Sequence, residues 1–277
     1  MGSSLTVVVP TRDAASTLPS CLESLACQGF RDFEVLLMDG ASKDETLALA
    51  ESYRDRLPRL QVESERDGGI YQAMNRGLAQ AGGEFVMFLG SDDAIHGADV
   101  FEGLFAGRHR RALARGDLVY GDAEIVPEGK LVRGPFGCAR LFSRNICHQC
   151  MLYRTDVLRS IGGYRAEYRA LADWLANVRL FCTPTVRVRY VPEVICFFRS
   201  GGFHVNHRED PAFYEERDAI LNGFLRLDSW EKVRCRRWWR AQRDRGFLSG
   251  RAFGLGALLR RVAGVGGKGQ SDERSSR

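Results

Sequence analysis

The chain has 277 residues, of which 44% are hydrophobic and 27% are charged, which is the composition of an ordinary soluble globular protein. No uncharged stretch approaches the roughly 18 residues of a membrane span, so an integral membrane protein is not expected. Residues 1–10 lack the charged start and the long apolar core of a secretory signal, which makes the cytoplasm the expected compartment.

The formal net charge of +5 is unevenly distributed along the chain. Residues 230–277 hold 13 Lys or Arg and 4 Asp or Glu, a net charge of +9, whereas the residues before them hold 27 basic and 31 acidic side chains. A strongly basic end on a mildly acidic body indicates a polyanionic partner, either a membrane surface or a nucleic acid.

Strand and helix patterns alternate through the first hundred residues. Short apolar runs predict strands at residues 5–9, 34–38, 60–63 and from residue 85. The segments between them predict helices that begin near Leu18, Thr46 and Ile70. This alternation is typical of βαβ units and predicts an α/β fold with a mostly parallel, Rossmann-like sheet flanked by helices.

The regular alternation ends near residue 100. The second half is predicted to contain strands at residues 118–120, 186–191 and 194–198, a hairpin at 124–133, and helices at 155–161 and 170–181. We therefore expect one domain over residues 1–229, made of a nucleotide-binding half, 1–100, and an acceptor-side half, 101–229.

The last segment, residues 230–277, is predicted to be a basic amphipathic helical tail. Apolar residues recur there at helical spacing, flanked by arginines, in the order Leu248, Ala252, Leu255, Leu259 and Val262. Such a segment could lie on an anionic membrane surface. The alternative is a tail that packs on the body or stays solvated, and residues 266–277 are expected to be disordered.

The eight cysteines, at positions 21, 27, 138, 147, 150, 182, 196 and 235, are scattered and are interpreted as reduced thiols. Cys147 and Cys150 form a close pair whose spacing could supply part of a zinc site. No second pair stands at a matching distance, so structural zinc is not the favoured interpretation.

Acidic residues follow the predicted strands of the first half. Asp39 and the pair Asp92 and Asp93 follow strands, and Asp67 follows a strand-like segment. The loops after the strands of a doubly wound sheet gather along one edge, so these carboxylates are expected to converge. A divalent cation or ligand hydrogen bonds would relieve their repulsion, and oxygen-only ligation favours Mg²⁺ or Mn²⁺. The alternative is that residues 91–93 merely form a turn or cap a helix.

Four sequence blocks stand in order along the first half: VVVPT at residues 7–11, MDGASKDET at 38–46, DGGIYQAMNRG at 67–77 and FLGSDD at 88–93. Shorter blocks follow, namely HQ at 148–149, GGY at 162–164 and ADW at 172–174. Together they resemble the family 2 glycosyltransferases, enzymes of the GT-A fold that use nucleotide-sugar donors. The resemblance makes residues 1–229 a GT-A catalytic domain, most similar to transferases that build bacterial surface polysaccharides and glycolipids.

The resemblance implies roles for residues of these blocks. Thr11, Asp39 and Asp67 would contact the base and ribose of the donor nucleotide. Asp92 and Asp93 fall on the family's Asp-x-Asp position, which implies Asp93 as the metal ligand and Asp92 as a ribose contact. The implied cofactor is Mn²⁺ or Mg²⁺.

Asp173 matches the family's catalytic base, which takes the proton from an acceptor hydroxyl as that oxygen attacks the anomeric carbon and inverts it. The alternative for Asp173 is a solvated helix carboxylate. His148 is a weaker candidate on the acceptor or diphosphate side, and its alternative is a structural histidine. Asp122 and His204 are weaker still. Asp13 is left out of the site because this strand end departs from the family's pattern.

These residues predict an inverting, metal-dependent glycosyltransferase that moves a sugar from a nucleotide-sugar donor, a UDP-sugar, to a hydroxyl of a lipid-linked glycan or glycolipid. The expected location is peripheral, at the inner face of the cell membrane, with no nucleic-acid partner. A sugar nucleotidyltransferase is one alternative, although residues 10–15 do not form the Gly-rich phosphate loop it would need. A nucleic-acid-binding protein with a basic tail is the other.

Overall fold

The computed structural model describes residues 3–137, 140–141, 144–168, 170–200, 213, 215–217 and 219–220. The chain divides into two compact units, residues 1–213 and residues 214–277, and the sheet belongs to the first. The predicted domain boundary at residue 229 and the predicted basic tail lie outside the described residues. In the described part, no helix is both long enough and apolar enough to cross a membrane.

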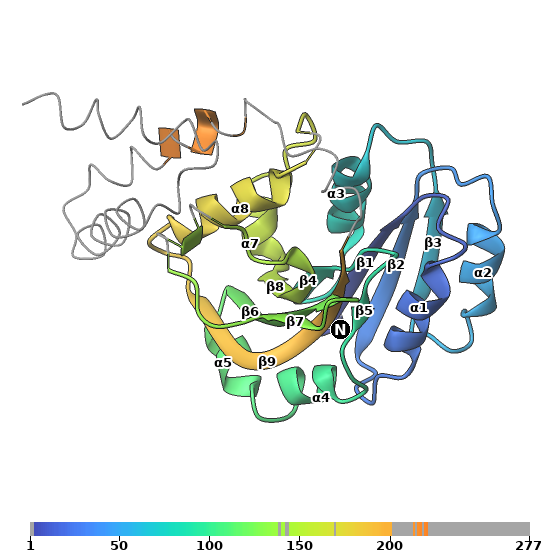
Figure 1. Ribbon diagram of the computed structural model, residues 1–277, viewed down its shortest axis with the longest axis horizontal. Coiled ribbons are helices and arrows are strands. Elements are labelled where there is room, and N and C mark those ends of the chain that lie inside the picture. The colour runs from blue at the N-terminus through green and yellow to red at the C-terminus, as the bar shows by residue number, and fades with distance from the viewer. Residues whose placement is uncertain are drawn as a thin grey trace, which may run out of the picture. The chain divides into compact units, whose positions relative to one another are not determined.

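The first four strands form a parallel sheet in the order β3-β2-β1-β4. The strands are β1 Leu5–Thr11, β2 Phe33–Asp39, β3 Leu60–Ser64 and β4 Phe85–Phe88, and the helices between them are α1 Leu18–Ala26, α2 Thr46–Ser52 and α3 Ile70–Gln80. From β1 the chain adds β2 and then β3 on one side, and it then returns to place β4 on the other side of β1. Right-handed crossovers therefore place α1 and α2 on one face of the sheet and α3 on the other, as Figure 1 shows.

The sheet continues in the order β4-β8-β6-β9-β5, and β7 pairs with β6. These strands are β5 Ala94–Ile95, β6 Leu118–Val126, β7 Lys130–Val132, β8 Met151–Arg154 and β9 Val188–Arg199. The helices are α4 Val100–Phe105, α5 Arg110–Arg115, the 3₁₀ helix η1 His148–Cys150, α7 Thr155–Ser160 and α8 Ala172–Phe181. β6 and β9 are parallel, whereas β8 is antiparallel to both of its neighbours. The predicted α/β fold is confirmed, and its sheet is parallel in the first half and mixed in the second.

The two strands predicted on either side of Pro192 form one strand, β9, which Figure 1 shows as long and curved. The register between β9 and β6 skips residues 191–193, so Pro192 lies in a bulge and breaks no regular ladder. Gly121 of β6 makes room for the bulge, because a Cβ there would lie 2.5 Å from the carbonyl oxygen of Glu193. The hairpin predicted at residues 124–133 is confirmed by the antiparallel pairing of β6 with β7.

Residues 89–93 connect β4 directly to β5, although β5 lies at the far edge of the sheet beside β9. The sheet curls, so that this edge comes back toward the end of β4. The connection carries Asp92 and Asp93 into the curl, where the Asp93 side chain is only 2% exposed. The fold thus buries the carboxylate of Asp93, which was predicted to follow a strand.

The core of the first half is packed closely between α3 and β1. Every residue of β1 and β2 is buried, as expected for strands with helices on both faces. Gly77 of α3 faces Val8 of β1, and a Cβ at Gly77 would lie 2.4 Å from Val8 Cγ1. The helix can approach the strand this closely only because residue 77 has no side chain.

Gly77→Ala is therefore expected to lower the free energy of unfolding by about 1–3 kcal/mol, the usual range for overpacking a core. Denaturant unfolding measures the change. Gly29→Ala is the matched control, because a Cβ there would lie 3.8 Å from the Ala98 carbonyl oxygen, an ordinary van der Waals contact. Equal stability of the Gly77 variant and the control would contradict the close packing of α3 on β1.

Candidate active site

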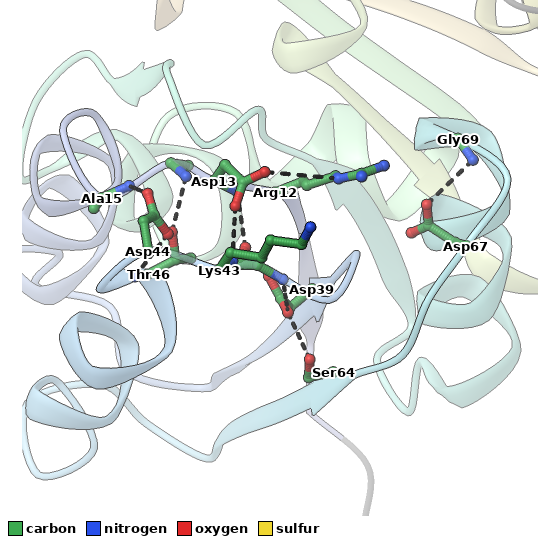
Figure 2. Close-up of polar contacts among 12 residues, drawn as sticks. Arg12, Asp13, Ala15, Asp39, Lys43, Asp44, Thr46, Ser64, Asp67 and Gly69 are labelled. Atoms are coloured by element: carbon green, nitrogen blue, oxygen red, sulfur yellow. Dashed lines mark hydrogen bonds and ion pairs between the residues drawn. The ribbon is translucent and has the colours of Figure 1, made fainter.

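Asp39 ends β2 and is completely buried. Its carboxylate accepts hydrogen bonds from the Ser42 amide at 2.9 Å, from the Ser64 hydroxyl at 2.6 Å and from the Ser42 hydroxyl. Figure 2 shows the contact between Asp39 and Ser64, which are paired at the ends of β2 and β3. These donors fix the carboxylate at the edge of the sheet where the nucleotide was predicted to bind.

Thr11 lies beside Asp39, because the two residues are paired at the ends of β1 and β2. The Thr11 hydroxyl is buried and has no hydrogen-bond partner within the described part of the chain. An unpaired buried hydroxyl costs free energy, and most such groups in proteins are paired. This hydroxyl is therefore suited to a hydrogen bond with a ligand.

Asp67 approaches the same strand end from the loop before α3. A Cβ on Gly40 would lie 3.2 Å from Asp67 Oδ2 and 3.3 Å from Arg12 Cδ, so a glycine at this position leaves space for both side chains. Figure 2 shows the Arg12 side chain extending toward Asp67, which accepts a hydrogen bond from the Gly69 amide at 3.1 Å. The Arg76 guanidinium lies 3.7 Å from the Asp67 carboxylate. Asp67 thus joins the other predicted nucleotide contacts.

Asp13, which was left out of the predicted site, connects two loops. Its carboxylate accepts a hydrogen bond from the Lys43 amide at 2.8 Å, and its own amide donates to the Ser42 hydroxyl at 2.8 Å. Asp44 makes a similar connection by accepting a hydrogen bond from the Ala15 amide at 3.0 Å (Figure 2). These bonds hold the loops after β1 and β2 together, which is a structural role.

Asp93 is held from two sides. Its Oδ2 accepts a hydrogen bond from Gln149 Nε2 at 2.7 Å, and its Oδ1 accepts one from the Arg199 amide at 2.9 Å. The Arg199 side chain also donates from Nε to the Asp92 carbonyl oxygen at 3.3 Å. η1 and the end of β9 therefore fix the acidic pair between them.

The environment of Asp93 fits a bound cation. Burial, reinforced by the charge of Asp92, raises the pKa of Asp93 to about 7, and a cation would offset both effects. A carboxylate has about four lone-pair sites, so two hydrogen bonds leave capacity for a metal. Among the described residues, no three His, Cys, Asp or Glu side chains are grouped to hold a metal ion. A cation at Asp93 would therefore need oxygen ligands from a substrate, such as phosphate oxygens.

Asp173 lies in the first turn of α8 and is 4% exposed. Its Oδ1 accepts a hydrogen bond from the Tyr71 hydroxyl at 2.8 Å, and its Oδ2 accepts one from Asn145 Nδ2 at 2.7 Å. His148 Nδ1 lies 3.3 Å from the same Oδ2. The alternative of a solvated helix carboxylate is therefore wrong, because Asp173 is buried and held by the side chains of Tyr71, Asn145 and His148.

His148 contacts Asp173, and its charge depends on that contact. Burial lowers the pKa of His148, but the Asp173 carboxylate raises it, with support from Cys147 and Asp93, so that it lies above its ordinary value. The protonated ring complements the carboxylate. The predicted role of His148 on the acceptor or diphosphate side stays a prediction.

Two connections join Asp173 to Asp93 and to the loop that holds Asp67. The adjacent residues His148 and Gln149 of η1 contact Asp173 and Asp93 respectively, so a three-residue segment joins both carboxylates. Tyr71 lies in the first turn of α3, directly after the loop that holds Asp67. The structure therefore links the predicted nucleotide contacts, the predicted metal ligand and the predicted base.

The weaker candidates do not join this set. Asp122 accepts hydrogen bonds from the Gly134 amide at 3.0 Å and the Tyr190 hydroxyl at 2.9 Å, which tie β6 to its neighbours. His204 lies outside the described residues. Cys147 and Cys150 belong to no metal-binding group in the described part of the chain.

Among the described residues, four that contact Asp93 or Asp173 received no role from the sequence, namely Tyr71, Asn145, Gln149 and Arg199. Tyr71 and Gln149 lie inside blocks that carry the family resemblance, so their motif positions were a usable signal. Asn145 and Arg199 lie outside those blocks, and only the tertiary structure brings them to the site.

The chain is similar to known glycosyltransferases in sequence and in fold. The model of glycosyl transferase family 2 matches residues 6–106 of the chain. The chain is 40% identical over 236 residues to a PGL/p-HBAD biosynthesis glycosyltransferase of Mycobacterium tuberculosis, covering 84% of this chain and 90% of that protein.

Solved structures show the same fold. Residues 1–349 of Staphylococcus aureus TarS in complex with UDP-GlcNAc match 93% of this chain and 77% of that one, with a TM-score of 0.70 and 23% identity. The mannosyltransferase PcManGT of Pyrobaculum calidifontis, in complex with GDP-Man and Mn²⁺, matches 96% of this chain and 81% of that one, with a TM-score of 0.58 and 18% identity. The predicted GT-A fold is confirmed. Together with the family match and the mycobacterial relative, it shows that this chain belongs to glycosyltransferase family 2.

Proposed function

We propose that this chain is an inverting, metal-dependent glycosyltransferase that transfers a sugar from a UDP-sugar to a hydroxyl of a lipid-linked glycan or glycolipid. The observation that carries the proposal is the buried Asp173 carboxylate, held by three side chains and linked through η1 to Asp93. Membership of the family supports the reaction class.

Asp173 takes the acceptor's proton. A bond forms between the acceptor oxygen and the anomeric carbon, the bond from that carbon to the phosphate oxygen breaks, and the electron pair leaves with UDP. The proton of the acceptor hydroxyl passes to the Asp173 carboxylate. Tyr71 and Asn145 hold this carboxylate in one orientation, so little reorganisation is needed when the acceptor arrives. One displacement inverts the anomeric configuration.

Asp93 would hold Mn²⁺ or Mg²⁺. A bound cation supplies positive charge that offsets the charge developing on the diphosphate. Gln149 and the Arg199 amide keep the Asp93 carboxylate in place for this task. The Mn²⁺ in the complex of the structurally similar mannosyltransferase supports a divalent cation here.

Thr11, Asp39 and Asp67 would bind the nucleoside of the donor. The unpaired Thr11 hydroxyl can pair with a polar group of the base, and the two carboxylates can accept hydrogen bonds from base N–H and ribose hydroxyl groups. Asp92 would add a ribose contact. The complex of TarS with UDP-GlcNAc supports a uridine nucleotide.

The acceptor and the location extend the proposal. A relative named for PGL/p-HBAD biosynthesis supports an acceptor of glycolipid or cell-surface glycan type. The net charge of +9 in residues 230–277 suits an anionic lipid surface at the inner face of the cell membrane. Salt-sensitive sedimentation of the full chain with anionic vesicles, but not with neutral vesicles, tests this location; equal sedimentation with both would contradict it.

A thermal-shift screen of nucleoside diphosphates in Mn²⁺ tests the donor class. A ligand present at about 100 times its Kd adds about 2.7 kcal/mol to the free energy of unfolding, so UDP should raise the unfolding temperature more than GDP or ADP does. The UDP-sugars can then be assayed for consumption with and without EDTA. Absence of any nucleotide effect, or full consumption in EDTA, would contradict the proposal.

Tyr71→Phe is expected to lower kcat about tenfold, because a hydrogen bond to a charged group contributes about 1.5–3 kcal/mol and helps to orient the carboxylate. The ionised carboxylate also loses a donor, so the acid side of the pH profile of kcat should move to higher pH. The KM for the donor should change little. Tyr53→Phe is a matched control, because its hydroxyl contacts α1 at 3.3 Å, away from the acidic centres. A Tyr71→Phe profile that overlays the wild-type profile would rule out this positioning role.

A further inference from the structure

Three cysteine thiols gather around η1. Cys147 precedes η1, Cys150 ends it and Cys196 lies in β9, and each of the three thiols shifts the pKa of the other two. Cys150 and Cys196 are buried, whereas Cys147 is partly exposed. The proposed mechanism uses none of these thiols. They belong to no metal-binding group among the described residues. Thiols react as nucleophiles in their thiolate form.

Cys147 and Cys150 have the backbone geometry for a disulfide. The Cys150 amide donates a hydrogen bond to the Cys147 carbonyl oxygen at 3.1 Å, so the two residues close a single turn. In a 3₁₀ turn the rise is about 2.0 Å per residue. The two Cα atoms are then about 6 Å apart, inside the range of about 4.4–6.8 Å found for disulfides. The Cys150 thiol itself lies 3.0 Å from the Cys147 carbonyl oxygen.

The thiols of Cys147 and Cys196 act on the Cys150 thiol. They lower the pKa of Cys150 below its ordinary value, although burial opposes this. The thiolate is the nucleophilic form of cysteine and the form that peroxides oxidise. Cys147 is the neighbouring thiol that could resolve an oxidised Cys150.

The two residues between these cysteines contact Asp93 and Asp173. The Cys147 thiol donates to Gln149 Oε1 at 2.9 Å, and Gln149 Nε2 donates to Asp93 at 2.7 Å. His148, the other residue of the turn, contacts Asp173. A disulfide would remove the thiol donor to Gln149 and draw the two sulfur atoms to about 2.05 Å, so the residues between them would have to move.

We propose that Cys147 and Cys150 form a reversible, peroxide-reactive dithiol whose disulfide displaces His148 and Gln149 and lowers sugar transfer. The effect on transfer rests on the proposed function. The Cys150 thiolate attacks a peroxide oxygen, the O–O bond breaks, and a sulfenic acid and, after protonation, one water form. The Cys147 thiol then attacks the sulfenic sulfur, the S–S bond forms and a second water leaves. The two thiols lose two electrons, one hydrogen peroxide is reduced to two waters, and a dithiol reductant reverses the oxidation.

The test uses the reduced full chain treated with hydrogen peroxide, blocked with an alkylating reagent and digested for mass spectrometry. The expected product is a Cys147–Cys150 disulfide, seen as a loss of about 2 Da, the mass of the two thiol hydrogens. UDP-sugar consumption should fall by at least about tenfold in parallel, consistent with losing a positioning contact. Dithiothreitol should restore it.

Cys150→Ser should form no such disulfide and should keep its own untreated activity after peroxide. Cys27→Ser is the matched control, because Cys27 is exposed in the loop after α1 and should leave the peroxide response unchanged. Absence of the disulfide, a bond from either thiol to Cys196, or a disulfide form with full activity would each overturn the proposal. A reduced chain that consumes no UDP-sugar would instead count against the proposed function, while the disulfide measurement still decides whether the dithiol reacts.

Discussion

Asp173→Asn is expected to lower sugar transfer by about 10²- to 10⁴-fold, the usual contribution of a positioned general base. Asparagine preserves the shape of the side chain and an acceptor for Tyr71 or Asn145, but its amide cannot take the proton from the acceptor hydroxyl. The loss should fall on kcat, because the base acts in the transition state. Calorimetry should show that UDP still binds in Mn²⁺.

Asp117→Asn is the control for losing a buried carboxylate. Asp117 accepts hydrogen bonds from Arg187, which hold the pKa of Asp117 below its usual range. A lowered pKa contributes stability above the ordinary pKa of the group, and this stability is lost as the pH falls. Asp117→Asn should therefore unfold more easily at pH 7 but transfer sugar at the wild-type rate. A wild-type rate of sugar transfer in Asp173→Asn would show that Asp173 is not the general base.

Asp93→Asn is expected to lower transfer by about 10²- to 10³-fold, comparable to removing one group that stabilises charge in a transition state. Asparagine can still accept a hydrogen bond from Gln149 or from the Arg199 amide, so the local fold should survive. The neutral amide, however, is a much weaker ligand for a hard cation. The stabilisation of the chain by UDP in Mn²⁺ should be lost, which a thermal shift measures.

Asp13→Asn is the control for Asp93, because Asp13 is an acidic loop residue with a structural role. It should keep the wild-type response to Mn²⁺. If both variants respond to Mn²⁺ as the wild type does, Asp93 is not the metal ligand.

The pKa of Asp93 predicts how cation binding depends on pH. Because burial raises the pKa of Asp93 to about 7, the carboxyl is protonated in the more acidic range and must lose its proton to bind a cation. The apparent affinity for Mn²⁺ should rise about tenfold per pH unit up to about pH 7 and then level off. Titration of UDP-dependent stabilisation at several pH values measures this, and a pH-independent affinity would contradict the assignment.

The first half of the fold could be predicted because its signals are local. β1 and β2 are apolar runs, and each helix between the strands shows its own pattern. The second half depends on contacts between distant segments. β5 has only two residues and exists through its pairing with β9, while β8 lies between β4 and β6, which are far from it in the chain. No local pattern specifies such partners.

The site also has a part that could be predicted from the sequence and a part that could not. Asp39, Asp67 and Asp93 follow strands or precede a helix, so topology alone predicts that they meet at one edge. The burial of Asp173 could not be predicted, because its partners come from α3, η1 and the segment before η1. The hydrogen bond from the Gln149 amide to Asp93 could not be predicted either, because the two residues meet only in the folded chain.

The anomeric configuration of the sugar released from an α-linked UDP-sugar tests the central claim most directly. Transferases can pass the sugar slowly to water, and NMR can identify the first anomer before the free sugar equilibrates. A single displacement with Asp173 as the base predicts that the β anomer appears first, in a reaction that requires Mn²⁺ or Mg²⁺ and is lost in Asp173→Asn. First appearance of the α anomer would contradict the single displacement and the role of Asp173 in it.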